Sequence, residues 1–148
     1  MGGIRFQRGN YVVADLEKAL RFYEGVLGFD VTYILPPNPD SYSYPVFAIP
    51  CEAVMRFCVL STESQPRVMA LTEVKGVGLP SVPYPRRCAI VLEIDDLDGV
   101  IAGARALELM VYDEEVLHTN DGRVGREIGI VDFDDNLVVI YKIMGEAA

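Results

Sequence analysis

The stretch Asn10-Tyr11-Val12-Val13-Ala14-Asp15-Leu16 recurs later in the chain as Val91-Leu92-Glu93-Ile94-Asp95-Asp96-Leu97. In each copy an apolar run suited to a strand leads to an aspartate, which is a preferred residue at a helix N-cap. The sequence therefore predicts an internal duplication. In a duplicated fold whose halves enclose a site, functional side chains are expected at matching positions on the first strand of each copy.

The first half is predicted to have the order β-α-β-β-β. Residues 6–13 suit a strand, and the apolar residues after Asp15 recur at helical spacing as far as Gly28, where a left-handed C-terminal cap belongs. Runs of β-forming residues predict the remaining strands at 29–35, 44–49 and 54–60. The first module is thus expected to span residues 5–62.

The segment 63–86 is rich in Pro and Gly and is predicted to be a connector, with a short strand as an option at residues 67–71. The second module, residues 87–145, repeats the order of elements. It has a strand at 88–94 and a helix capped by Asp96. Its further strand candidates are residues 110–112, 115–119, 126–131 and 137–143.

Two stretches carry a family resemblance: Val13-Ala14-Asp15-Leu16-Glu17-Lys18-Ala19-Leu20-Arg21-Phe22-Tyr23 with Val26-Leu27-Gly28-Phe29, and Asp132-Phe133-Asp134-Asp135-Asn136-Leu137-Val138-Val139. With them the chain resembles the vicinal oxygen chelate superfamily, which includes glyoxalase I, extradiol dioxygenases, methylmalonyl-CoA epimerase, and the fosfomycin and bleomycin resistance proteins. The resemblance implies one α+β domain over residues 1–148, in which two tandem βαβββ modules form a curled mixed sheet around a central cavity. Phe133 and Asp135 replace the proline and glycine of the superfamily's last turn, but aspartate tolerates a left-handed backbone.

The resemblance also identifies where a metal would bind. The superfamily's metal enzymes place a ligand seven residues before the capping Asp of each module and seven residues after the first Asp of the last turn. Here these positions are Arg8, Ala89 and Val139, which offer no lone pair to a metal. A fourth ligand is expected near residues 55–57, which include no carboxylate or imidazole. We therefore expect no metal site and no cofactor.

The charge of the chain limits its partners. It has 13 basic and 22 acidic residues and a formal net charge of -9, which repels nucleic acid and anionic lipid. No apolar run approaches the length of a membrane span, and the N-terminus is too short and polar for a signal peptide, so we expect a cytoplasmic protein. A homodimer is expected because small paired-module proteins of this superfamily usually associate.

Two charged residues occupy equivalent faces of the duplicated strand. Arg8 is a candidate for binding a carboxylate, phosphate or enolate of a ligand, and the alternative is a structural ion pair with Glu93. Glu93 lies in an apolar strand, where a carboxylate can act as a catalytic acid or base, unless it lies at a wet strand end.

Four further residues are candidate ligand contacts. Asn10 shares the face of Arg8, and Tyr141 follows the Val139 position by two residues. Arg56 is a second anion contact if it faces the cavity, and is solvated if it faces outward. His118 is the only histidine, so it cannot form a His-pair metal site, and a surface position is the alternative.

The leading hypothesis is a glyoxalase/bleomycin-resistance-like protein that binds a small organic molecule in the cavity between its modules without the usual metal. The net charge agrees with the bleomycin resistance branch, which binds a cationic drug, whereas Arg8 and Arg56 are poor partners for a cation. Two alternatives stay open. One is a lyase, isomerase or dioxygenase with an atypical metal set of Gln7, Glu93 and His118, and the other is metal-free catalysis with Glu93 as base and Arg8 stabilising an oxyanion.

Overall fold

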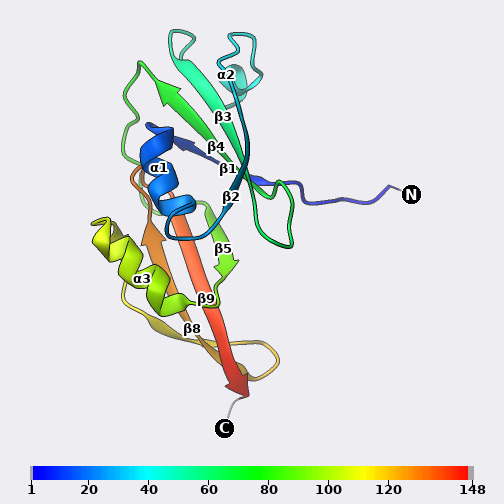
Figure 1. Cartoon of the computed structure of the whole chain (residues 1–148), viewed down its shortest axis with the longest axis vertical. Coiled ribbons are helices and arrows are strands. Elements are labelled where there is room, and N and C mark those ends of the chain that lie inside the picture. Colours follow the sequence, from blue (N-terminus) through cyan, green and yellow to red (C-terminus); the bar gives the residue numbers. More distant parts are fainter. Residues whose placement is uncertain (1, 147–148) are drawn as a thin grey trace. The chain divides into compact units, whose positions relative to one another are not determined.

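The computed structural model describes residues 2–146 and divides into two compact units, residues 1–80 and 81–148 (Figure 1). Each unit contains one mixed β-sheet and one amphipathic helix of at least two turns. In the part of the chain that is described, no helix is long and apolar enough to cross a membrane.

The first unit has a four-stranded sheet in the order β1-β4-β3-β2. The strands β1 and β4 are parallel, and the other neighbouring pairs are antiparallel. Its elements are β1 (Gly9–Val13), α1 (Leu16–Tyr23), β2 (Asp30–Leu35), α2 (Ser43–Val46), β3 (Val54–Ser61) and β4 (Met69–Lys75).

Helix α1 begins where the sequence predicts, but it ends at Tyr23, before the predicted cap Gly28. The Asp15 carboxylate accepts a hydrogen bond from the Lys18 amide at 3.0 Å, which satisfies one of the free N–H groups of the first turn. The last helical residue is Tyr23, and Gly28 follows with a φ of +91°, a left-handed conformation that glycine adopts at little cost. The apolar side of α1 is buried in this unit and consists of Leu16, Ala19, Phe22 and Tyr23.

Two predictions for the first unit are wrong in their details. Residues 44–49 do not form a strand, because Pro45 has no N–H for a ladder and lies in the short helix α2, which ends before Ala48 at a φ of 54°. The third strand after α1 is instead β4, which lies within the segment 63–86 that was predicted to be a connector. The optional short strand at residues 67–71 was the only part of the prediction that overlaps β4. The order β-α-β-β-β is nevertheless confirmed, with α2 inserted before β3.

The second unit repeats this order with one extra short strand, β7. Its sheet has the order β5-β9-β8-β6, and β7 pairs with β8. Its elements are β5 (Ala89–Glu93), α3 (Leu97–Ala106), β6 (Met110–Val111), β7 (Glu115–His118), β8 (Arg123–Val131) and β9 (Leu137–Glu146). Asp96 caps α3 by accepting a bond from the Gly99 amide at 3.1 Å. All the strands predicted for this half are present, so the tandem βαβββ modules and the α+β class are confirmed.

The turn between β8 and β9 keeps its form despite its unusual residues. The buried Asp132 carboxylate accepts bonds from the amides of Asp134 and Asn136, at 2.8 and 2.9 Å, and from the Asn136 side chain at 3.0 Å. Asp135 adopts a φ of 68°, the left-handed conformation that aspartate was expected to tolerate. Asp132 therefore holds the turn in place of the missing proline and glycine.

Candidate functional site

One face of the first sheet gathers polar and aromatic side chains. In the ladders, Val12 lies opposite Thr72, and Thr72 lies opposite Phe57, so these residues share a face. Asn10 is two residues before Val12 and belongs to the same face. The Arg8 guanidinium lies 6.0 Å from the centre of the Phe57 ring and joins them.

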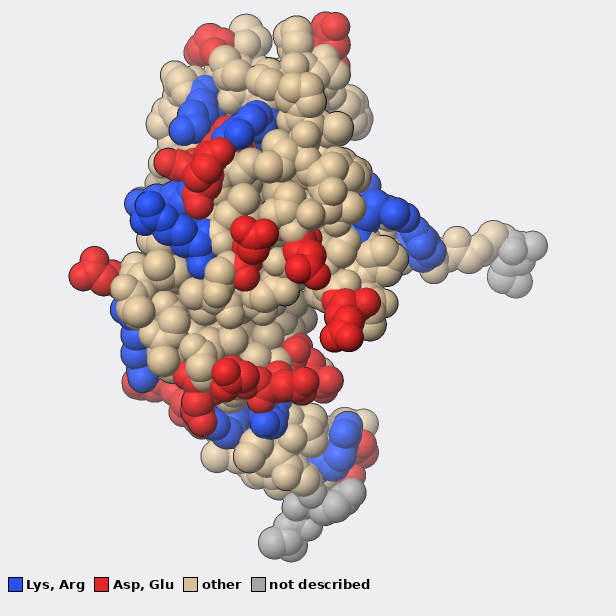
Figure 2. All heavy atoms as spheres, viewed as in Figure 1, with Lys and Arg blue, Asp and Glu red and all other residues tan. Residues whose placement is uncertain are grey.

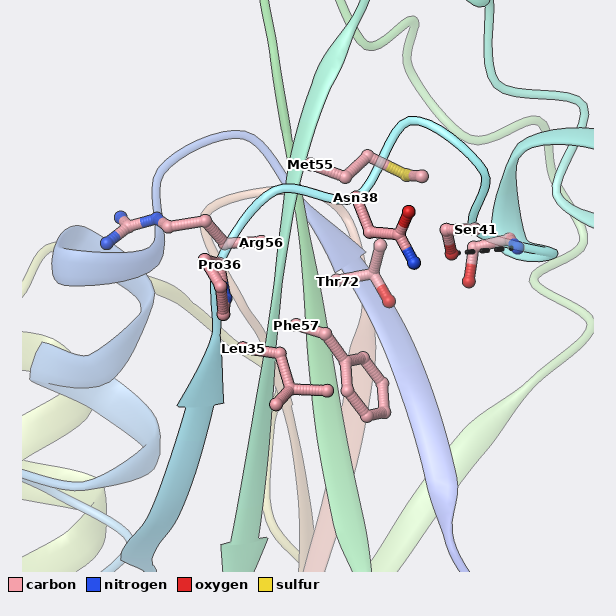
Figure 3. A pocket seen from close by; sticks show the side chains of 9 residues that line it. Leu35, Pro36, Asn38, Ser41, Met55, Arg56, Phe57 and Thr72 are labelled. Carbon is pink, nitrogen blue, oxygen red and sulfur yellow. Dashed lines mark hydrogen bonds between the residues drawn. The ribbon is translucent and has the colours of Figure 1, made fainter.

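A pocket of about 210 Å³ opens on this face of the sheet. The strands supply its floor, which includes the almost fully buried Met55 and Thr72 and the half-buried Phe57. Figure 3 shows the Leu35 and Phe57 side chains beside each other below Asn38 and Thr72. Its complete lining is Leu35, Pro36, Asn38, Ser41, Ser43, Met55, Arg56, Phe57 and Thr72.

Asn10 and Thr72 are polar neighbours on this face, and of the two only Thr72 lines the pocket itself. The Thr72 hydroxyl donates to Oδ1 of Asn10 at 3.0 Å. This bond leaves the Asn10 amide N–H groups as donors and the Thr72 oxygen as an acceptor. The site can therefore hydrogen-bond an oxygen-bearing ligand that packs its apolar part on Phe57 and Met55.

Arg8 adds a positive charge at the rim of this face. It is half-buried and donates a bond of 3.3 Å to the Arg67 carbonyl oxygen. Within residues 2–80 no carboxylate forms an ion pair with Arg8. A guanidinium held in this way can take an anionic group of a ligand.

Arg56 is one of the pocket residues, but its charged group does not lie over the pocket floor. Its guanidinium turns away from Phe57 and Thr72 in Figure 3. The Nε atom lies 2.7 Å from Oε1 of the buried Glu73, and Nη2 lies 2.8 Å from Glu17. These two carboxylates raise the pKa of Arg56. Arg56 thus has ion-pair partners on the helix side of the sheet. The sequence had suggested either an anion contact in the cavity or a solvated side chain, and this arrangement is neither.

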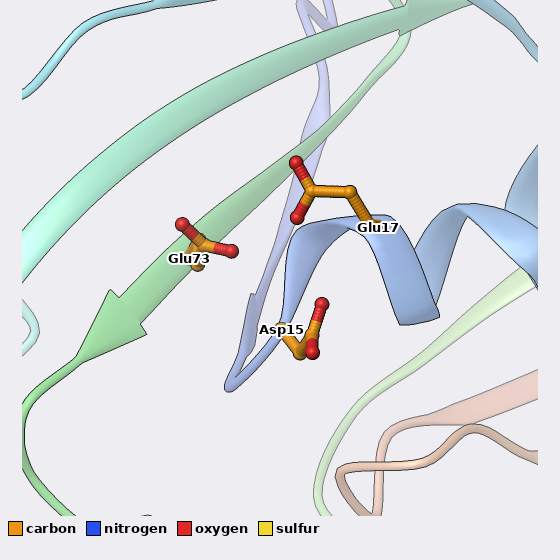
Figure 4. Close-up of side chains that lie close together, drawn as sticks. All are labelled: Asp15, Glu17 and Glu73. Atoms are coloured by element: carbon orange, nitrogen blue, oxygen red, sulfur yellow. The ribbon is translucent and has the colours of Figure 1, made fainter.

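The same region contains a cluster of carboxylates. Single oxygens of Asp15, Glu17 and Glu73 all lie within 4.8 Å of one another (Figure 4). A cluster of this kind can hold a metal ion when its oxygens are free. Here Arg56 already neutralises two of its members, and Asp15 caps α1. The arrangement fits a structural ion-pair network better than a metal site.

The superfamily's metal positions do not fit a metal either. The last strand of the first unit is β4, so the fourth ligand is expected there rather than on β3 near residues 55–57. On the face of β4 that matches Asn10, the residues are Ala70, Thr72 and Val74, none of which has a carboxylate or imidazole. In the second unit, Ala89 and Val139 have no donor atom at all.

Glu93 and Tyr141 share one face of the second sheet. They lie directly opposite each other in the β5–β9 ladder, and Tyr141 lies opposite Glu127 on β8. Glu93 is the last residue of β5 and is exposed, which matches the alternative of a wet strand end.

His118 lies on the other face of that sheet. Glu115 pairs with Glu127 and so shares the face of Glu93, whereas His118, three residues further along β7, points the opposite way. Glu93 and His118 therefore cannot bind one metal ion together. Gln7, the third member of that hypothetical set, is exposed and accepts a bond from Arg5 at 2.7 Å. The opposite faces of Glu93 and His118 argue against the atypical metal set.

Figure 2 shows how charged side chains are distributed on one face of the molecule. Acidic and basic side chains are interspersed on the face shown in Figure 2, and no broad basic patch gathers there. A nucleic-acid site would require such a patch.

The pocket residues Thr72, Leu35, Asn38 and Ser41 were not predicted from the sequence. Thr72 lies on β4, a strand that the sequence reading mostly missed. Asn38 and Ser41 lie in a loop with no periodic pattern. The direction of Phe57 could have been predicted, because it follows Arg56 on a strand and its side chain must point to the opposite face.

The fold matches known proteins over almost its whole length. The chain resembles a glyoxalase family protein from Bacillus cereus (TM-score 0.70, 13% identity, 98% of this chain and 97% of that chain). It also resembles the trypanothione-dependent glyoxalase I of Leishmania major (TM-score 0.64, 18% identity, 95% and 87%) and the fosfomycin resistance protein FosX of Listeria monocytogenes (TM-score 0.57, 16% identity, 95% and 92%). No curated protein sequence matches it significantly. The model of the Glyoxalase/Bleomycin resistance protein/Dioxygenase superfamily matches residues 5–140, and the chain therefore belongs to this superfamily.

Proposed function

We propose that this protein binds a small organic acid in the pocket of its first sheet, without the metal that its superfamily usually uses. The observation that carries the proposal is the Arg8 guanidinium, which lies against the pocket residue Phe57 and has no carboxylate partner in its own unit. A cation of this kind beside an apolar pocket suits a ligand with one anionic group.

The pocket limits the size and shape of the ligand. Its volume of about 210 Å³ is below the range of about 300–1,000 Å³ typical of sites for drug-sized molecules. The apolar part of the ligand would pack on Phe57 and Met55. A carbonyl or hydroxyl oxygen would accept a bond from the Asn10 amide, and the anionic group would reach Arg8.

Binding is favoured over catalysis because the donors of the usual chemistry are missing. Arg8, Ala89 and Val139 cannot coordinate a metal. Metal-free catalysis with Glu93 as base and Arg8 as oxyanion partner remains the alternative, and it predicts turnover of the bound acid. The roles of Tyr141 and His118 as ligand contacts stay predictions.

A thermal-shift screen tests the proposal. Small carboxylic acids, phosphonates and neutral analogues of equal size would be compared at one ionic strength. A true ligand at a hundred times its dissociation constant should add about 2.7 kcal/mol of stability. We expect stabilisation by acids and not by the matched neutral amides. Equal stabilisation by both groups would contradict the role of Arg8.

We also propose that the protein is a homodimer. Several large apolar side chains of the first unit are exposed, among them Ile34 and Leu35 on the edge strand β2 and Phe47 after α2. An exposed apolar edge strand is commonly covered by another chain.

A further inference from the structure

A second arginine, in the other unit, is held between two tyrosine rings. The Cζ atom of Arg86 lies 4.8 Å from the centre of the Tyr84 ring and 5.8 Å from that of Tyr112. Its Nη1 donates to the Tyr112 hydroxyl at 2.5 Å, and its Nη2 donates to the Tyr84 hydroxyl at 3.4 Å. Two cation–π contacts and two hydrogen bonds fix the guanidinium in one place.

A glycine on β8 makes room for this arrangement. The Tyr112 amide donates to the Gly129 carbonyl at 2.9 Å, which anchors the residue to the sheet edge. A Cβ atom at Gly129 would lie 3.2 Å from Cδ2 of the Tyr112 ring, closer than most such contacts. The missing side chain therefore lets the Tyr112 ring lie close to β8, and the hydroxyl of this ring accepts from Arg86.

Arg86 has no negative partner, although the chain is strongly acidic. The arginines Arg56, Arg123 and Arg126 each form ion pairs with carboxylates. Within residues 81–146 no carboxylate pairs with Arg86, and its buried Nε atom has no hydrogen-bond partner. A half-buried guanidinium held by neutral groups alone keeps its full charge available to a ligand.

The unused donors match a carboxylate. A guanidinium has five N–H groups, of which one is on the enclosed Nε atom and two are bonded to the phenol oxygens. One N–H remains on each Nη, and one N–H from each Nη is a combination with which Arg binds the two oxygens of a carboxylate. Both phenols accept from Arg86, so their own hydroxyl protons are free to donate as well.

We propose that Tyr84, Arg86 and Tyr112 form an anion site that binds the carboxylate of a small organic acid. The flanking aromatic rings favour an acid with a flat apolar body over a compact ion. All three residues belong to the second unit, and none of them lines the pocket of the first sheet. The proposed function and this site can therefore fail independently.

NMR of the arginine Nε–Hε groups provides the test. The Arg86 signal would be assigned by its loss in Arg86→Lys, and sodium benzoate would then be titrated into the whole chain at constant ionic strength. We expect a saturable shift of this signal with a dissociation constant in the millimolar range. Absence of a shift, or an equal shift with sodium chloride, would overturn the proposal.

Two variants and a second probe complete the experiment. Tyr84→Phe keeps the ring and removes one donor from an exposed residue, and it should weaken benzoate binding about tenfold. Arg87→Lys, at the exposed neighbouring arginine, should leave the titration unchanged. Inorganic phosphate should bind more weakly than benzoate, and tighter binding of phosphate would contradict a carboxylate site.

Discussion

The Nε atom of Arg56 lies 2.7 Å from Oε1 of Glu73, directly across the β3–β4 ladder. The other oxygen of Glu73 accepts the Leu16 amide, also at 2.7 Å. One buried carboxylate thus joins two neighbouring strands and the first residue of α1. Because Glu73 is 2% exposed, losing its partners would leave a desolvated charge.

Replacing Glu73 by glutamine should destabilise the protein. Glu73→Gln keeps the size of the side chain but removes its charge, and it weakens the bonds to Arg56 and the Leu16 amide. We expect a loss of about 1–3 kcal/mol in the free energy of unfolding, because these are hydrogen bonds to a buried charged group. Chemical denaturation measures this change.

Glu17→Gln is the matched control. Glu17 binds the same guanidinium at 2.8 Å, but its side chain is 68% exposed. Exposed ion pairs contribute little, so this variant should retain nearly all of the wild-type stability. An equal loss in both variants would show that the burial of Glu73 is not what matters.

Glu73 should also make stability depend on pH. Burial by itself would raise the pKa of this carboxyl, but the bonds from Arg56 and the Leu16 amide outweigh it and hold the pKa below the ordinary value of 4.5. A lowered folded-state pKa means that the stabilisation is complete above about pH 4.5 and is lost as the pH falls through the folded-state value. The wild type should therefore lose stability below pH 4.5 more steeply than Glu73→Gln. Parallel acid-unfolding curves would argue against this assignment.

The sequence predicts those elements whose signals are local. Asp15 and Asp96 cap their helices, and Gly28 takes the left-handed conformation, because each needs only its immediate neighbours. Strand β4 shows the limit of such signals. It is buried at every residue but Lys75, so it has no alternation, and the Pro and Gly around it resemble a loop.

The side-chain partners were less predictable than the strands. Parity along β3 separates Arg56 from Phe57, but it does not say which face meets the helix. Its partner Glu73 lies on β4, so an ion pair between them could not be foreseen without that strand. The partners of Arg86 were even harder to predict from the sequence, because Tyr112 comes from a separate segment of the unit.

Metal analysis is a direct test of the missing ligands. We expect purified protein to contain no stoichiometric zinc, iron, nickel or manganese, and chelators to leave the melting temperature unchanged, because Arg8, Ala89 and Val139 cannot coordinate. Elemental analysis by mass spectrometry measures the content. If a metal is found and Glu73→Gln or Glu17→Gln removes it, the carboxylate cluster with Asp15 is the site instead.

The oligomeric state should depend on the apolar edge of the first sheet. Light scattering is expected to give twice the mass of one chain. Ile34 is 41% exposed on β2, so Ile34→Lys should favour the monomer while changing the fold little. A wild-type protein that scatters as one chain at micromolar concentration would contradict the homodimer.

Substitutions at Arg8 and Thr72 should weaken ligand binding in different ways. Arg8 makes one protein hydrogen bond, of 3.3 Å, so Arg8→Ala should leave the melting temperature nearly unchanged. It should weaken binding of an acid found in the thermal-shift screen about tenfold or more, since a hydrogen bond to a charged group is worth about 1.5–3 kcal/mol.

Thr72→Val removes the bond to Asn10. It should weaken binding of the acid and of its neutral amide equally, because neither the charge nor Arg8 is altered. Arg5→Ala, at an exposed arginine bonded to Gln7, is the control for net charge. Calorimetric titration distinguishes these outcomes, and an Arg8→Ala variant that binds the acid as tightly as the Arg5→Ala variant would exclude Arg8 from the site.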